Sequence, residues 1–167
     1  MKKLFCLRIV TALLLVLSAG SSFAQIKAKT KSLPKAQPDA NSTVTKRVLA
    51  VFQRDFKGAA KINWSKVDES FHVSFVIDRQ KNAILYNSDG YMIYHIVFGF
   101  AKNLTKDVAD QVSGEYPNCK IQTVFHVFQG RVEVWFVDLE QEKSLIQARV
   151  EDGLLMEDYR IGNQILQ

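Results

Sequence analysis

Three histidines and one thiol are the side chains of this chain best suited to chemistry. His72, His95 and His126 each fall in a segment with strand periodicity, and none lies two or four residues from another. A three-histidine metal site needs imidazoles that converge on one face with hydrogen-bond partners behind them. The spacing instead indicates isolated strand histidines, so we expect no metal site and no bound cofactor.

The pattern for nucleophilic catalysis is equally weak. Cys119 and His126 are seven residues apart, and no third group is in position to orient the imidazole. Asp89 and Asp152 each precede a glycine, which is typical of tight turns. The sequence contains no glycine-rich phosphate loop, no Gly-x-Ser-x-Gly and no Cys-x-x-Cys. We therefore expect no catalytic residues and predict that the protein is not an enzyme.

Aromatic residues are the more informative set. Trp135 shares a predicted strand face with Arg131 and Glu133, and these residue types commonly anchor protein interfaces. Trp135 fits the core and an interface equally well, whereas Trp64 is expected in the core. Together with His72, these three residues form the predicted partner-binding set: Arg131, Glu133, Trp135 and His72.

The first half of the domain must position these residues with one helix and four strands. Val48 and Phe52 belong to an apolar stripe that predicts a helix over 43–57, and Gly58 ends it. Four strands follow, over 61–66, 71–78, 81–87 and 91–100. Asp89-Gly90 is a hairpin signal between the last two.

The second half repeats this order. Thr105 can cap a helix whose stripe ends at Tyr116, before Pro117. Strands are predicted over 120–128, 131–140, 143–151 and 154–161. The predicted fold class is therefore α+β, a tandem repeat of one helix followed by a four-stranded antiparallel sheet. Because the fold is built from two similar halves, we expect the function where the halves meet.

The N-terminal region has the pattern of a processing segment. Lys2 and Lys3 precede an apolar run over 9–17, and small residues favour cleavage after Ala24. The predicted organisation is a signal peptide (1–24), a flexible linker (25–42) and one domain over 43–162, with repeats over 43–100 and 101–162. The chain is thus expected to be exported, to the periplasm or outside, with no integral membrane segment after cleavage. Cys119 would then be the only cysteine, which excludes an intramolecular disulfide.

The formal net charge of +5 is carried by the N-terminal region. From Leu49 onward the chain has 13 basic and 16 acidic residues. Nucleic-acid binding needs clustered Lys and Arg on the folded surface. We therefore expect no nucleic-acid partner.

The ordered motifs resemble a known family. They are Phe56-x-x-Ala59-x-x-Ile62-x-Trp64, Phe71-x-Val73-x-Phe75 and Asp89-Gly90 in the first half, with Leu104, Tyr116-Pro117, Lys120-Ile121 and Asp152-Gly153 in the second. Residues 45–160 resemble the small exported bacterial proteins described as PepSY-like or β-lactamase-inhibitor-like. The resemblance implies a tandem fold of helix plus four strands, a concave sheet surface for binding, and no enzymatic activity.

These observations predict a non-catalytic exported protein-binding module that docks through its sheet surface. Its partner would be an unidentified envelope or secreted protein, for example an enzyme that it restrains. A small-ligand or metal-sensing periplasmic module, with a pocket between helix and sheet or between the halves, is the alternative. An enzyme that uses Cys119 is a third.

Overall fold

The computed structural model describes residues 44–162. The predicted signal peptide (1–24) and linker (25–42) lie outside the described residues. The elements, in chain order, are α2 (Lys46–Asp55), β1 (Ala60–Val67), β2 (Ser70–Ile77), β3 (Gln80–Tyr86), β4 (Met92–Gly99), the short 3-10 helix η3 (Ala101–Asn103), α3 (Lys106–Glu115), β5 (Lys120–Gln129), β6 (Val132–Gln141), β7 (Ser144–Glu151) and β8 (Leu154–Gly162).

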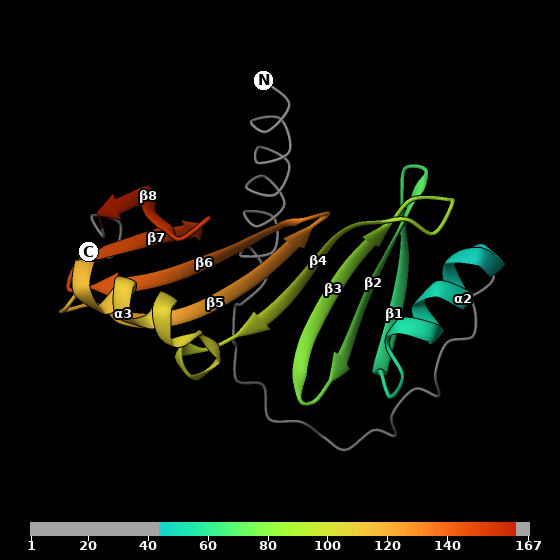
Figure 1. Cartoon of the computed structure of the whole chain (residues 1–167), viewed down its shortest axis with the longest axis horizontal. Coiled ribbons are helices and arrows are strands. Elements are labelled where there is room, and N and C mark those ends of the chain that lie inside the picture. Colours follow the sequence, from blue (N-terminus) through green and yellow to red (C-terminus); the bar gives the residue numbers. More distant parts are fainter. Residues whose placement is uncertain (1–43, 163–167) are drawn as a thin grey trace, which may run out of the picture. The chain divides into compact units, whose positions relative to one another are not determined.

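All eight strands form one continuous antiparallel sheet, in the order β1 to β8 (Figure 1). The predicted fold class, a tandem repeat with a separate four-stranded sheet in each half, is therefore wrong. The difference lies at β4 and β5, which pair along their length, with Ile96 opposite Val127. This pairing satisfies backbone groups that two separate sheets would leave open at their edges.

The helix α2 begins at a side-chain cap and covers β1–β3. The hydroxyl of Thr45 accepts a hydrogen bond from the backbone N–H of Val48 at 3.3 Å, which satisfies one of the free donors of the first turn. Val48 and Phe52 are buried in a cluster that also contains Trp64, as predicted for the core. The helix is shorter at both ends than the predicted range of 43–57.

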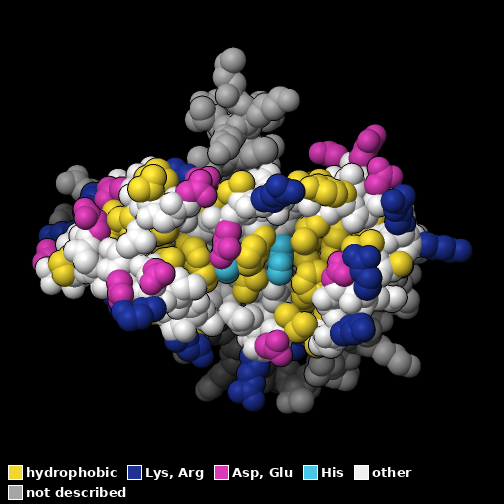
Figure 2. Space-filling view, viewed as in Figure 1, with side chains coloured by type: hydrophobic (Ala, Val, Ile, Leu, Met, Phe, Trp, Pro, Cys, Tyr) yellow, Lys and Arg dark blue, Asp and Glu magenta, His cyan; other side chains and the backbone are white. Residues whose placement is uncertain are grey.

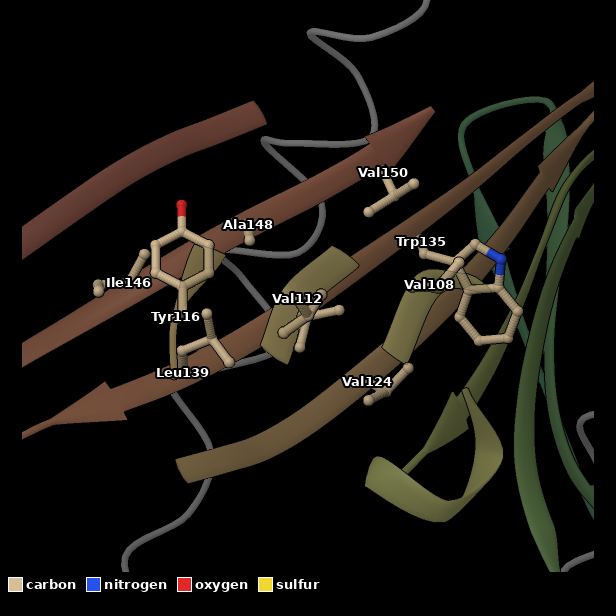
Figure 3. Close-up of a cluster of buried hydrophobic side chains, with 10 residues drawn as sticks. Val108, Val112, Tyr116, Val124, Trp135, Leu139, Ile146, Ala148 and Val150 are labelled. Carbon is tan, nitrogen blue, oxygen red and sulfur yellow. The ribbon is translucent and has the colours of Figure 1, made fainter. Parts of the chain in front are cut away.

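The helix α3 covers the strands of the other half. Asp107 lies in its first turn, where a negative charge favours the helix dipole, and Pro117 follows its C-cap. Val108 and Val112 pack with Trp135 and Val150 in a second buried cluster (Figure 3). The two helices therefore build two separate hydrophobic cores along one sheet.

Both cores lie on the same face of the sheet. Ile84, which lies under α2, is opposite His95 of β4. His95 is opposite Phe128, and Phe128 is opposite Glu133, so these side chains all point to one face. Trp135, two residues further on, points to the same face and belongs to the core of α3. The other face carries Ile96 and Val127 on the central strands, and neither described helix covers it.

The predicted turns at Asp89-Gly90 and Asp152-Gly153 are confirmed by backbone conformation. Gly90 has a φ of 79° and Gly153 a φ of 74°, values that glycine adopts without strain. Gly90 also lies close to α2, since an added Cβ would be 3.3 Å from Cγ2 of Val51. The turn thus holds the β3–β4 hairpin against the helix.

One buried hydroxyl leads to a stability prediction. The hydroxyl of Tyr86 is buried in the core of α2 and has no hydrogen-bond partner among residues 44–162. Burial raises the pKa of Tyr86 to about 12. An unpaired buried hydroxyl costs about 1–3 kcal/mol. Tyr86→Phe is therefore expected to raise the free energy of unfolding by about 1 kcal/mol in urea denaturation. Tyr91→Phe, at a 64% exposed residue, should change it by less than about 0.5 kcal/mol; a destabilised Tyr86→Phe protein would contradict the assignment.

Candidate functional site

Five rings form a continuous row across the sheet between the two cores, here called the aromatic row. Its members, in spatial order, are Phe56, His95, Phe128, His126 and Trp135. Successive ring centroids are 5.4, 5.7, 4.1 and 3.7 Å apart. The row starts at the C-cap of α2 and ends in the core of α3. It is therefore the feature that links the two covered parts of the sheet.

Strand register brings these rings together. His95 of β4 lies opposite Phe128 of β5, and His126 lies opposite Trp135 of β6. Phe128 and His126 are two residues apart, so they project from the same face. The pairing of β4 with β5 is thus what builds the middle of the row.

His95 is held in one tautomer by Asn82. The side-chain amide nitrogen of Asn82 donates to the backbone oxygen of Gln80 at 2.9 Å. The amide oxygen of Asn82 then lies 2.8 Å from Nε2 of His95, so this ring nitrogen must carry the proton. Burial, with a smaller contribution from His126, lowers the pKa of His95 to about 4. The imidazole is therefore neutral at neutral pH.

His126 has an acidic partner on the β5–β6 hairpin. Its Nε2 lies 2.5 Å from a carboxylate oxygen of Glu133. Burial lowers the pKa of His126, and the Glu133 carboxylate opposes this shift. The indole of Trp135 stacks on the imidazole with an interplanar angle of 13°. The ring is thus fixed between an aromatic face and a carboxylate.

The structure gathers three of the four predicted partner-binding residues. Arg131, Glu133 and Trp135 all lie on the β5–β6 hairpin. Arg131 is exposed, and the side chain of Glu133 is 56% exposed. Trp135 is only 8% exposed and belongs to the core of α3. Its ring packs in the core and also stacks on His126, which makes it the last member of the aromatic row.

His72, the fourth predicted residue, is on the other face of the sheet. It lies in β2 between two residues packed under α2, Phe71 and Val73, so its side chain projects away from that helix. Its Nδ1 is 3.3 Å from the hydroxyl of Ser65, and burial followed by the charge of Lys81 lowers its pKa. A single surface cannot include both His72 and the aromatic row.

Sequence reasoning missed that two histidines lie near each other. His95 and His126 both contact the ring of Phe128, although they are far apart in the sequence. The signal that would have revealed them is the register between β4 and β5, which no local pattern contains. Figure 2 shows imidazole surface at the centre of this face, with hydrophobic side chains on both sides of it.

In the described part of the chain, the residues of the other candidate sites, a Cys119–His126 pair and a metal site, are not brought together. Cys119 is partly buried against the core of α3, and about 20 Å of extended chain separate it from His126. Within residues 44–162, no three His, Cys, Asp or Glu side chains are grouped closely enough to hold a metal ion. In the same residues, no helix has the length and apolarity needed to cross a membrane.

Solved structures share this fold. A BLIP-like protein from Bacteroides fragilis has a TM-score of 0.62 at 12% sequence identity and covers 74% of this chain and 91% of its own. A protein described as periplasmic from Bacteroides eggerthii gives 0.61 at 14%, covering 74% and 93%. A DUF2874 family protein from Bacteroides ovatus gives 0.60 at 19%, covering 75% and 94%.

At these identities the likeness concerns the fold. The BLIP-like neighbour agrees, at the level of the fold, with the β-lactamase-inhibitor-like part of the resemblance seen in the sequence. The PepSY-like part remains a prediction. No family model matches the chain, and no curated protein matches its sequence.

Proposed function

We propose that this protein is an exported, non-catalytic protein-binding module that docks an envelope or secreted protein on the strip of sheet between α2 and α3. The observation that carries the proposal is the aromatic row. It places four half-buried rings and one buried indole on the part of the face that lies between the two cores.

The composition of this strip suits a protein interface. Interfaces combine aromatic anchors at the centre with polar and charged residues at the rim. Here Phe128 and His126 lie at the centre, and the exposed residues Arg131 and Glu133 lie beside them near the β5–β6 turn. The rings are held by the sheet and by their neighbours, so little side-chain entropy is lost on binding.

The fold neighbours support the class of function. One is a BLIP-like protein and another is described as periplasmic, which fits a partner-binding role and export for this chain. Fold likeness alone does not specify a partner. We therefore propose a class of partner: a protein in the same compartment, for example an enzyme that this chain restrains.

A charge swap at the rim tests the docking surface. The double variant Arg131→Glu with Glu133→Arg keeps the net charge. It is expected to weaken capture of the partner about tenfold, because charges at the rim of an interface steer association and fix the orientation of the partner. The measurement is quantitative co-purification from envelope extract with the chain as bait, followed by titration with the captured protein.

A matched swap on another hairpin is the control. Lys66→Glu with Glu69→Arg changes the same charge types at exposed positions of the β1–β2 hairpin. It should leave capture within about twofold of the unmodified chain. Equal effects of the two swaps would argue against docking at the aromatic row.

A further inference from the structure

A pocket opens beside the aromatic row, between η3 and strands β3–β6. Its volume is about 290 Å³, at or below the lower end of the range typical of small-molecule sites. It is therefore sized for one side chain. The lining residues are Gln80, Val97, Gly99, Asn103, Val124, His126 and Trp135.

The pocket has an apolar floor that depends on a glycine. Val97, Val124 and the ring of Trp135 supply the apolar surface. A Cβ added at Gly99 would lie 3.0 Å from Cβ of Asn103 and 3.1 Å from its side-chain oxygen. Only a residue without a side chain leaves Asn103 in its present place.

Two polar groups at the pocket, on Trp135 and Asn103, offer hydrogen-bond donors. Trp135 is 8% exposed, and within residues 44–162 its indole N–H has no acceptor. Figure 3 shows its nitrogen on the side of the ring turned away from Val112. The side-chain oxygen of Asn103 accepts from the backbone N–H of Phe100 at 2.9 Å, which leaves the amide nitrogen as its available end.

Among the described residues, only the Tyr86 hydroxyl is a fully buried side-chain N or O atom without a partner, so the indole N–H of Trp135 is open to solvent. A ligand oxygen that replaces water there keeps a hydrogen bond to Trp135. None of the described residues that line the pocket is Lys or Arg, and burial of a carboxylate without a cation is unfavourable. The donors therefore fit a neutral carbonyl oxygen. An apolar side chain next to a carbonyl is what an extended peptide presents.

We propose that this pocket takes one apolar side chain from an extended segment of the protein partner, and that a main-chain carbonyl oxygen of that segment accepts a hydrogen bond from the indole N–H of Trp135. This inference rests on the proposed protein-binding function and specifies what the partner must present. In this proposal, His126 and Trp135 of the aromatic row form part of the wall of a pocket that selects one side chain of the partner.

A blocked amino acid is a direct probe of the pocket. N-acetyl-L-leucinamide carries one apolar side chain and two carbonyls, and N-acetylglycinamide is the same molecule without the side chain. The chain has two tryptophans, so its indole N–H groups give two signals in a ¹H–¹⁵N correlation spectrum, assigned with Trp64→Phe. We expect the Trp135 signal to shift saturably with the leucine probe, with a Kd of about 1–10 mM for a ligand of this size. The Trp64 signal, from under α2, should not move.

Two variants test the location. Val97→Phe fills the pocket and is expected to weaken binding of the leucine probe at least tenfold, with the Trp64 signal reporting that the fold is intact. Should Val97→Phe not fold, Gln80→Ala removes one polar group of the wall and should weaken binding about threefold. No saturable shift, an equal shift from the glycine probe, or undiminished binding in a folded variant would overturn the inference.

The inference and the proposed function can fail separately. Capture of the protein partner by Val97→Phe at unchanged affinity would overturn the pocket but leave the docking proposal in place. Specific binding of the leucine probe, with capture insensitive to the Arg131 and Glu133 charge swap, would support the pocket and contradict docking at the rim.

Discussion

Replacement of Trp135 by alanine is expected to lower the free energy of unfolding by about 3–5 kcal/mol. The indole is 8% exposed and packs in the core of α3 with Val108 and Val150. Its other contact is the stacked imidazole of His126, with centroids 3.7 Å apart. Removal of the ring would leave a cavity at the junction of the core and the aromatic row.

Urea denaturation followed by circular dichroism measures this loss. Leu154→Ala, at a residue 66% exposed, is the control and should change stability by less than about 0.5 kcal/mol. A loss below about 1 kcal/mol for Trp135→Ala would show that the indole is not part of the core. The expected loss also means that docking should be tested at Arg131 and Glu133, since a Trp135 variant would confuse binding with folding.

Acidification from pH 7 to pH 5 is expected to remove about 1–2 kcal/mol of stability through His95. Burial holds the pKa of His95 at about 4 in the folded chain, against about 6.5 when unfolded. The unfolded state therefore binds more protons between these values. The contribution of His95 is complete above about pH 6.5 and is lost as the pH falls toward 4.

Neighbouring groups modify this dependence in known directions. The pKa values of His72 and His126 are also lowered, so both act in the same direction as His95. Burial raises the pKa of Asp138, so its contribution is present at low pH and is lost as the pH rises through its folded pKa. That effect has the opposite sign.

Stability measured from pH 5 to 8 in the unmodified chain and in His95→Gln tests the assignment. Glutamine can still donate to the side-chain oxygen of Asn82 but does not titrate. The variant should therefore lose about 1–2 kcal/mol less than the unmodified chain between pH 7 and pH 5. Parallel curves for the two proteins would show that His95 is not the buried titrating group.

Local features of the fold were predictable from the sequence. Period-two alternation placed each strand within a few residues, and the Asp-Gly pairs marked two turns correctly. The apolar stripe through Val48 and Phe52 identified the buried side of α2, and Trp64 was assigned to the core. These properties depend on residues close in sequence, where spacing determines which side chains share a face.

The arrangement of the sheet was not predictable in the same way. Whether β4 stops at an edge or pairs with β5 depends on residues separated by η3 and α3, and the periodicity of each strand is the same in both cases. The single sheet therefore overturned the expected fold class of two four-stranded sheets. The same pairing created the proximity of His95 and His126.

The candidate site was predictable where its residues are close in sequence. Glu133 and Trp135 are two residues apart on β6, so their proximity follows from strand geometry. Arg131 lies next to them in the turn of the same hairpin. His72 was added from a distant strand without a register to place it, and the structure puts it on the opposite face. Asn103, one of the two donors of the pocket, lies on η3, an element that the sequence did not predict.

Site-specific photocrosslinking tests the central claim, docking at the aromatic row, most directly. A benzoylphenylalanine introduced at Arg131 lies in the β5–β6 turn beside the aromatic row. One at Leu145, 45% exposed, lies on the other face of the sheet. Irradiation in the native compartment is expected to give a covalent adduct with the protein partner from position 131 and none from position 145. An adduct from position 145 alone would contradict the account and place the partner on the opposite face.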